Sequence, residues 1–214
     1  MPMSRFLALV AVFSLCLSMQ GQRVLECWKT MPDALLPYLD ASSRTAMVEQ
    51  YDITQKADNK AELNTGVANR LRGTSTLDTL TTNYLRLRLN ERATWEMKLI
   101  ATDGDNFVIA TSMTVFGDSP ESKVSLFSSD WKHLSDTIFT EQSLVKPEEM
   151  SSEEYQKLTD GLSLVLWEAH FSPDNDDLTL SPSLLFVPSD EKERYKALKM
   201  QKFLKFNGNI FNQY

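Results

Sequence analysis

The strongest constraint on the fold is a run of strand patterns in the middle of the chain. Residues 84–89 (YLRLRL) alternate leucine with arginine, which is the period-two pattern of a half-buried strand. A three-residue loop at 90–92 would place Arg86 opposite Glu96 and would set apolar residues opposite one another on the other face. Arg86 and Arg88 together could hold a carboxylate or phosphate. The simpler interpretation is a cross-strand ion pair with Glu96 on a solvated face.

More strands follow this hairpin. Turn residues at 103–105 and 117–120 separate two further strands, expected at 107–116 and from about 123 to 128. Residues 107–110 are apolar at every position, so we expect this strand to be central and covered on one side by helices. The sequence therefore predicts a four-stranded antiparallel meander.

Helical patterns lie on both sides of the meander. Two short helices are expected between residues 31 and 51, the second capped by Ser42 or Ser43. Residues 151–158 have a serine cap and acids in the first turn, which is typical of a helix start. The remaining expected elements are a hairpin of strands 162–171 and 178–187, a helix from 188 to about 201, and a last strand at 203–211.

This order of elements predicts the fold class. We expect an α+β fold in which an antiparallel sheet, the four-stranded meander plus a second hairpin, carries helices packed on one face. No long linker rich in Pro, Gly or Ser divides the chain. Residues 22–214 are therefore expected to form a single α+β domain, or two packed subdomains at 22–134 and 135–214.

The N-terminus predicts export. Arg5 supplies a positive charge, and the uncharged apolar run at 6–19 is shorter than the roughly 20 residues that a spanning helix needs. Gly21 is the best small residue before a cleavage site, and Ser18 is the alternative. We expect residues 1–21 to be a signal peptide, with a buried N-terminal helix as the competing interpretation.

The two cysteines bear on the compartment. A bacterial lipoprotein anchored through Cys16 is the less favoured alternative, because a lipobox needs a small residue where this chain has Leu15. Cleavage after Gly21 leaves Cys27 alone, so no intramolecular disulfide is expected. We interpret Cys27, beside Trp28, as an apolar packing residue.

Composition argues against several functions. The chain has 22 Lys+Arg against 29 Asp+Glu and a formal net charge of -7, which opposes nucleic-acid binding. Only 7 Gly, 2 His and 2 Cys are present, so little material exists for a phosphate loop or a metal cage. We therefore predict no catalytic, cofactor-binding or metal-binding residues, and no cofactor.

The two histidines and an acidic turn are the residues that most resemble a catalytic or metal-binding motif. We interpret His133 and His170 as exposed or packed imidazoles. A Ser-His-acid triad stays open because its members can be distant in sequence, although the chain has no G-x-S-x-G elbow. The acidic run at 174–177 lacks the Gly and Glu of a calcium loop, so a hairpin turn is the simpler interpretation.

The tail at 199–206 interleaves lysine with phenylalanine. Such a pattern can contact anionic membranes as a helix, or stack on sugars or bases as a strand. The preferred interpretation is that Phe203 and Phe206 pack into the core while the lysines stay in water.

Three segments resemble a known family: residues 31–39 (MPDALLPYL), 95–115 and 122–131. The family consists of exported proteins of similar length from Bacteroidetes-type Gram-negative bacteria and is known only as a domain of unknown function. It often has Cys near 115–119, where this sequence has Phe116 and Gly117. The resemblance implies export and a shared architecture, and it brings no activity or catalytic residues.

These observations favour an exported periplasmic, cell-surface or secreted protein that acts as a non-catalytic binding or interaction module. Its expected partner is an envelope or extracellular protein or glycan, with no nucleic acid and no transmembrane span after signal cleavage. The alternative is an envelope hydrolase whose site uses carboxylates and His133 or His170. A polar cleft holding either histidine with a shifted pKa would favour the hydrolase, and a large apolar patch would favour the binding module.

Overall fold

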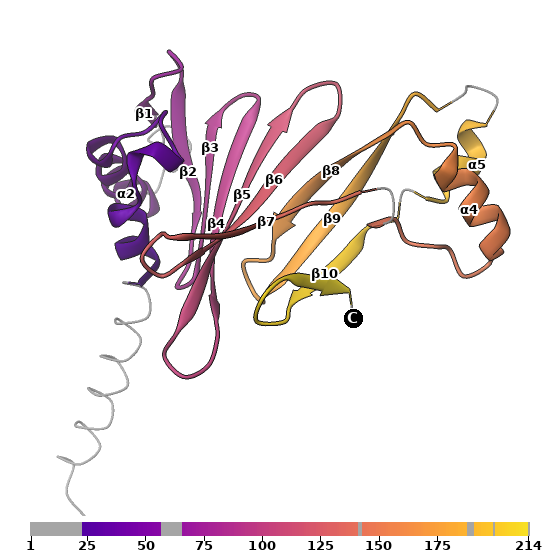
Figure 1. Ribbon diagram of the computed structural model, residues 1–214. Helices are drawn as coiled ribbons and strands as arrows, with labels where there is room; N and C mark the ends of the chain where they lie inside the picture. Colours follow the sequence, from indigo (N-terminus) through magenta and orange to yellow (C-terminus); the bar gives the residue numbers. More distant parts are fainter. Residues whose placement is uncertain (1–22, 57–65, 141–142, 188–190, 199, 214) are drawn as a thin grey trace, which may run out of the picture. The chain divides into compact units, whose positions relative to one another are not determined.

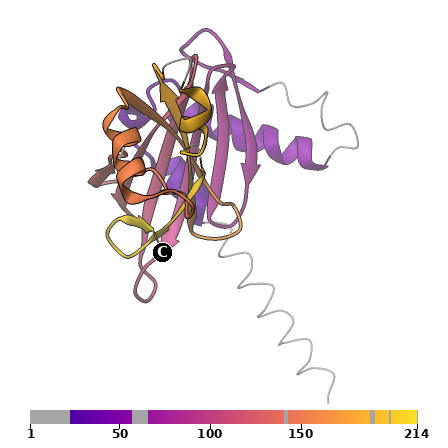
Figure 2. The same cartoon turned by 90° about the vertical axis from the view of Figure 1, so that its right-hand side faces the viewer.

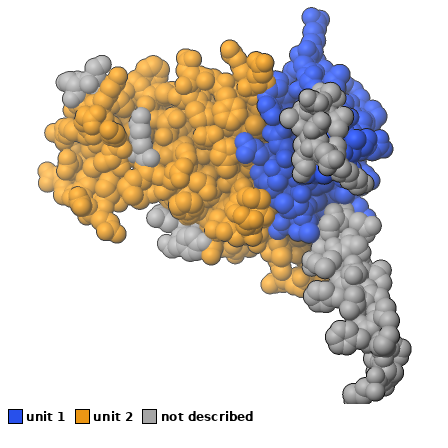
Figure 3. Space-filling view, turned by 180° about the vertical axis from the view of Figure 1, so that it is seen from behind, with its two compact units in different colours: residues 1–90 blue, residues 91–214 orange. Residues whose placement is uncertain are grey.

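The computed structural model describes residues 23–56, 66–140, 143–187, 191–198 and 200–213 (Figure 1). The expected signal peptide at 1–21 and the expected helix start at 188–190 lie outside the described residues. The chain forms two compact units, residues 1–90 and residues 91–214 (Figure 3). Each unit is described below by itself.

The described part of unit 1 combines helical segments with three strands. Residues 23–30 are helical, and they are followed by a short 3-10 helix, η1 (Asp33–Leu35), and by α2 (Ala41–Lys56). The strands are β1 (Val67–Ala68), β2 (Thr74–Leu80) and β3 (Tyr84–Asn90), and neighbouring strands pair antiparallel.

The first expected helix of unit 1 is wrong in extent, and the second has a different cap. Pro37 interrupts the pattern at 33–39, which forms only the 3-10 turn. Asp40 Oδ1 caps α2, because it accepts hydrogen bonds from Ser43 N at 2.9 Å and Ser42 Oγ at 2.7 Å. These bonds hold the pKa of the Asp40 carboxyl well below its usual range.

A buried arginine organises the N-terminal part of unit 1. The Arg44 side chain is 1% exposed, and its guanidinium donates to three backbone carbonyls and to the carboxylate of Asp33. The Arg44 carbonyl in turn accepts from Trp28 Nε1 at 3.0 Å. Burial of a guanidinium is tolerated only when its donors are satisfied, so Arg44 fixes the path of the chain on both sides of η1. The three carbonyls belong to Trp28, Met31 and Leu39.

Where unit 2 is described, it contains a meander, a second sheet and two short helices (Figure 1, Figure 2). The meander strands, all paired antiparallel, are β4 (Ala93–Ala101), β5 (Phe107–Phe116), β6 (Pro120–Ser128) and β7 (His133–Thr137). The second sheet has the order β11-β10-β9-β8, with β8 (Leu164–Phe171), β9 (Asp177–Leu185), β10 (Lys202–Phe206) and β11 (Phe211–Gln213). The helices are α4 (Ser152–Asp160) and α5 (Lys192–Lys196).

The expected α+β layout is wrong, because the protein is mostly antiparallel β. Strands β1 to β7 follow one another in a seven-stranded sheet, and β8 to β11 form a four-stranded sheet. The helices of the described residues are short and do not form a layer on a four-stranded meander. The strand expected to be covered by helices, β5, is covered within unit 2 by β8, since Ser112 Oγ donates to the Ala169 carbonyl.

Several elements of unit 2 confirm the sequence pattern. Ser151 Oγ accepts from Glu154 N at 3.1 Å and caps α4, and the helix ends before Gly161 as expected. The hairpin of β8 and β9 turns at 172–176, where Asn175 Oδ1 accepts from Asp177 N at 2.9 Å. The helix expected to reach residue 201 is wrong in extent, because α5 ends at Lys196 and β10 begins at Lys202. Nowhere in the described ranges is there a helix with the length and apolarity to cross a membrane.

Candidate functional site

Strand β8 is an edge strand of the four-stranded sheet, and side chains from β4, β5 and β6 bind its backbone. Ser122 Oγ accepts from Ala169 N at 2.8 Å, and Ser112 Oγ donates to the Ala169 carbonyl at 2.9 Å. Glu96 Oε2 accepts from Phe171 N at 2.9 Å. A free strand edge exposes unpaired backbone groups, so these side chains take the place of a neighbouring strand.

Glu96 also joins this edge to His170 and Glu168, and we call these three residues the imidazole cluster. Glu96 Oε1 lies 2.8 Å from His170 Nδ1, and Glu168 Oε1 lies 2.8 Å from His170 Nε2. Glu96 is 1% exposed, whereas the His170 side chain is 31% exposed. The hydrogen bond to Glu96 raises the pKa of His170 above its ordinary value, against the opposing effect of burial.

The geometry of the imidazole cluster limits its chemistry. Both ring nitrogens of His170 face carboxylate oxygens, an arrangement that favours the protonated imidazolium, in which both nitrogens donate. A ring in this state has no lone pair to accept a proton or to bind a metal ion. No group of three or more His, Cys, Asp or Glu able to hold a metal occurs among the residues that the structure describes.

A buried lysine lies two residues beyond Glu96 on β4. Lys98 Nζ donates to the carbonyls of Ser172 at 3.0 Å and Pro173 at 3.4 Å, and lies 3.9 Å from Asp176 Oδ1. The Lys98 side chain is 1% exposed, and this burial lowers its pKa. Lys98 therefore extends the side-chain contacts to β8 into the hairpin that follows it.

The sequence predicts a solvated face for Glu96, and this prediction is wrong. The sequence at 95–99 (WEMKL) alternates polar and apolar residues, which is typical of a half-exposed strand, but every residue of it is buried. The polar side chains are covered because β8 lies against that face within unit 2. Of the two arginines, Arg88 pairs instead with Asp78 of β2, at 3.5 Å.

His133 belongs to a separate and exposed group. His133 Nε2 lies 3.0 Å from Asp136 Oδ1, which also accepts from Ser125 Oγ at 2.6 Å. These two hydrogen bonds, with a smaller contribution from Lys123, lower the pKa of Asp136 to about 2. The structure thus gives the two histidines different partners and does not join them in one site.

The sequence predicts that the segment 199–206 buries its phenylalanines and leaves its lysines in water, and the structure differs from this at Lys202 and Phe203. Lys202 pairs in register with Leu180, so its stem follows the buried face of the sheet and its Nζ donates to the Ser143 carbonyl at 3.1 Å. Phe203 pairs with Thr179 and is 51% exposed. The expected burial of Phe203 is therefore wrong, and the register of β10 against β9 is the reason.

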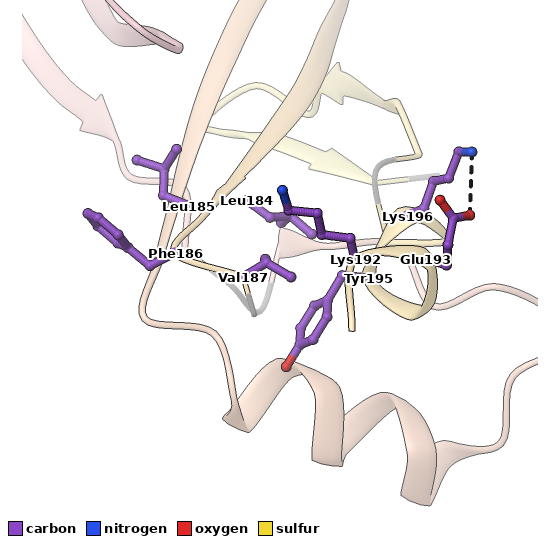
Figure 4. A pocket seen from close by; sticks show the side chains of 8 residues that line it. All are labelled: Leu184, Leu185, Phe186, Val187, Lys192, Glu193, Tyr195 and Lys196. Atoms are coloured by element: carbon purple, nitrogen blue, oxygen red, sulfur yellow. Dashed lines mark ion pairs between the residues drawn. The ribbon is translucent and has the colours of Figure 1, made fainter. Parts of the chain in front are cut away.

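A pocket of about 590 Å³ lies between the end of β9 and α5 (Figure 4). The end of β9 contributes apolar side chains at 184–187, and α5 contributes Lys192, Lys196 and their neighbours. Tyr195 also lines the pocket, and its hydroxyl group packs against Gly161, the C-cap residue of α4. The contact is so close that a β-carbon at Gly161 would lie 2.6 Å from the Tyr195 hydroxyl oxygen. Tyr195 therefore holds α5 against α4. Both helices lie at the same end of unit 2 in two views (Figure 1, Figure 2).

Phe186 is the unusual residue of this pocket. Its side chain is 80% exposed, and its backbone has φ 57°. A bulky residue rarely adopts positive φ, and a large apolar ring is rarely left so exposed. Sequence reasoning missed Phe186 because LLFV at 184–187 has the pattern of a buried strand end. The Pro188 that follows was the available sign that the strand ends there.

Comparison with known proteins places the chain in a family. A family model described as "Protein of unknown function (DUF3256)" matches residues 16–211. The chain belongs to this family. The expected membership in an uncharacterised family is thereby confirmed, while export remains a prediction. No curated protein matches the chain.

A solved structure supports the fold of this DUF3256 chain. It is similar to the structure of a domain of an uncharacterized protein from Porphyromonas gingivalis W83, with a TM-score of 0.66 and 17% sequence identity. The similarity covers 90% of this chain and 99% of that one. At this identity the likeness concerns the fold alone.

Proposed function

We propose that this protein is an exported, non-catalytic binding module whose ligand site is the pocket between β9 and α5. The observation that carries the proposal is Phe186, an 80% exposed ring on a residue with positive φ beside the pocket. Both features oppose stability, and strained residues of this kind cluster at binding sites. The pocket volume of about 590 Å³ lies in the range of small-molecule sites.

The export part of the proposal rests on the N-terminal sequence. Arg5 and the apolar run at 6–19 have the charge and length of a signal peptide. We propose that residues 1–21 are removed and that the protein acts in the periplasm or at the cell surface. Mass spectrometry of the protein recovered from cells should give an N-terminus near Gln22. A chain that retains residues 1–21 contradicts export by cleavage, and a lipid-modified Cys16 replaces the soluble form with a lipoprotein.

The chemistry of the imidazole cluster argues for binding rather than hydrolysis. His170 has the raised pKa that a catalytic histidine could have, but its two ring nitrogens face Glu96 and Glu168 at 2.8 Å. A general base needs a free ring nitrogen within reach of a substrate proton. We therefore assign the imidazole cluster to the attachment of β8 and not to a reaction.

Photo-crosslinking in cells tests the site. Replacement of Phe186 with p-benzoylphenylalanine puts a photoreactive ring beside the pocket, and the same replacement of Phe203 serves as control. Phe203 is also half exposed but lies on β10. We expect an adduct at position 186, measured by mass spectrometry of the purified protein, well in excess of that at position 203. Equal labelling at the two positions, or no adduct at either, contradicts the proposed site.

A further inference from the structure

The charge of the pocket indicates which class of ligand it takes. Two lysines of α5 line the pocket, and they differ in their partners. Lys196 Nζ pairs with Glu193 Oε2 at 3.6 Å. Figure 4 shows Lys196 turned toward Glu193, while the Lys192 side chain extends toward the end of β9. Within the described ranges no carboxylate oxygen lies within 4 Å of Lys192 Nζ.

The apolar part of the pocket lies on β9 and the residues just after it. Leu184 is 8% exposed, Leu185 and Val187 are half buried, and Phe186 is exposed. These four consecutive residues are all apolar, so the lining on this side offers no hydrogen-bond donor or acceptor from a side chain. A ligand there gains by burying apolar surface, at about 25 cal/mol per Å².

We infer that the pocket binds a small amphipathic anion, in which an apolar tail lies against 184–187 and a single anionic head lies at Lys192. This inference rests on the proposed function, since it names the ligand class of the same site. Among the described lining residues, Lys192 supplies a positive charge with no carboxylate within 4 Å, whereas Lys196 pairs with Glu193. Lys192 is exposed, so with a neutral ligand its ammonium stays in water and contributes nothing to binding, whereas a cationic ligand is repelled.

Calorimetric titration with three molecules that share one tail tests the inference. The probes are decanoate, decanol and decyltrimethylammonium, each used below the concentration at which it aggregates. The protein is purified from cells that process its N-terminus naturally. We expect decanoate to bind about fivefold more tightly than decanol, because its carboxylate can form one exposed ion pair with Lys192. The cation should bind most weakly. The preference for decanoate should shrink at 1 M salt, where charges are screened within about 3 Å.

Variants of the lining residues assign the charge effect to Lys192. Lys192→Met should weaken decanoate binding about fivefold and leave decanol binding unchanged. Lys157→Met, which removes an exposed lysine from α4, should change neither affinity. Phe186→Ser should weaken both ligands about tenfold through lost apolar contact, and the matched change Phe203→Ser should weaken neither. Circular dichroism and Tm establish that each variant is folded.

The outcomes separate this inference from the proposed function. Equal binding of decanoate and decanol, or decanoate binding that Lys192→Met leaves unchanged, overturns the anionic ligand class. If none of the three molecules binds while position 186 is crosslinked in cells, the ligand class is wrong and the binding module stands. If no molecule binds and no adduct forms at position 186, both are wrong.

Discussion

Glu96 Oε1 lies 2.8 Å from His170 Nδ1, while the other oxygen of the same carboxylate accepts the backbone N–H of Phe171 at 2.9 Å. One buried side chain therefore holds both the side chain and the backbone of the β8 edge. Glu96 is only 1% exposed, and a carboxylate buried to this extent needs a positive partner. His170 is one such partner, which links the attachment of β8 to pH.

The first prediction concerns this pH dependence. Because the folded-state pKa of His170 lies above its unfolded value of 6.5, its stabilisation is complete below pH 6.5 and is lost as the pH rises through the folded-state pKa. Glu96→Gln should lower the free energy of unfolding by about 2 kcal/mol at pH 6 and remove most of this dependence. Urea unfolding between pH 5 and 9 measures both effects. The exposed Glu121 provides the control, and an equal loss in Glu121→Gln would contradict the assignment.

A second prediction tests whether the hydrogen bond from the Ala169 N–H to Ser122 Oγ holds the backbone of β8 in place. Ser122→Ala leaves the Ala169 N–H without its acceptor, which should cost about 1–2 kcal/mol of folding free energy. Hydrogen exchange at the Ala169 amide should accelerate, while exchange at amides within the meander stays slow. Ser163→Ala, at an exposed position just before β8, should leave both measurements unchanged. Unaltered protection of Ala169 in Ser122→Ala would refute this interpretation.

A third prediction concerns the buried arginine of unit 1. Arg44→Met keeps most of the apolar stem but removes the donors to three backbone carbonyls and Asp33. We expect a loss of about 3–5 kcal/mol in the free energy of unfolding, measured by chemical denaturation. Arg70→Met is the control, since Arg70 is 65% exposed and its pair with Asp40 at 3.5 Å should contribute under about 1 kcal/mol. Similar losses in the two variants would show that Arg44 is not the organising residue.

A fourth prediction separates stability from binding at Phe186. Asparagine adopts positive φ more readily than phenylalanine, so Phe186→Asn should raise the free energy of unfolding by about 1 kcal/mol. The same variant should weaken decanoate binding about tenfold. Thermal unfolding and calorimetric titration measure the two effects. A variant that loses stability would mean that the ring packs against the fold and does not serve the pocket.

A fifth prediction concerns the thiol of Cys27, which is 6% exposed. Burial, together with the charge of Glu26, raises its pKa to about 11. Because the thiolate is the reactive form, Cys27 should resist alkylation by iodoacetamide at pH 8 in the folded protein. It should react within minutes once the chain is unfolded in guanidinium chloride. Fast labelling of the folded protein would contradict the burial of this side chain.

Strands β3 and β5 could be predicted, β3 because its leucines recur with period two and β5 because an apolar run lies between two sets of turn residues. The patterns at 84–89 and 107–116 gave β3 and β5 nearly at their observed bounds, and the turn residues placed β8 and β9. The strands β2 and β7 were missed because TSTLDTL and HLSDT contain few apolar residues. Their pairing is decided by neighbouring strands rather than by local hydrophobicity, and the fold class was wrong for that reason.

The candidate site could not be predicted, for two different reasons. Glu96 and Lys98 alternate with apolar residues, so their burial depends on β8, which lies more than sixty residues later in the chain. Phe186 has the pattern of a core residue, but in the structure its side chain is 80% exposed and its backbone has positive φ. Sequence patterns indicate which residues are apolar, but the packing of distant segments decides which of them remain exposed.

The closure of the β8 edge also bears on how the protein behaves at high concentration. Aggregation into cross-β fibrils usually begins when one molecule adds a strand to an open sheet edge of another. At β8 that addition would first have to displace Glu96 from Phe171 N and Ser122 from Ala169 N. Within the four-stranded sheet, whose order is β11-β10-β9-β8, a foreign strand is therefore expected to add at the β11 edge rather than at β8.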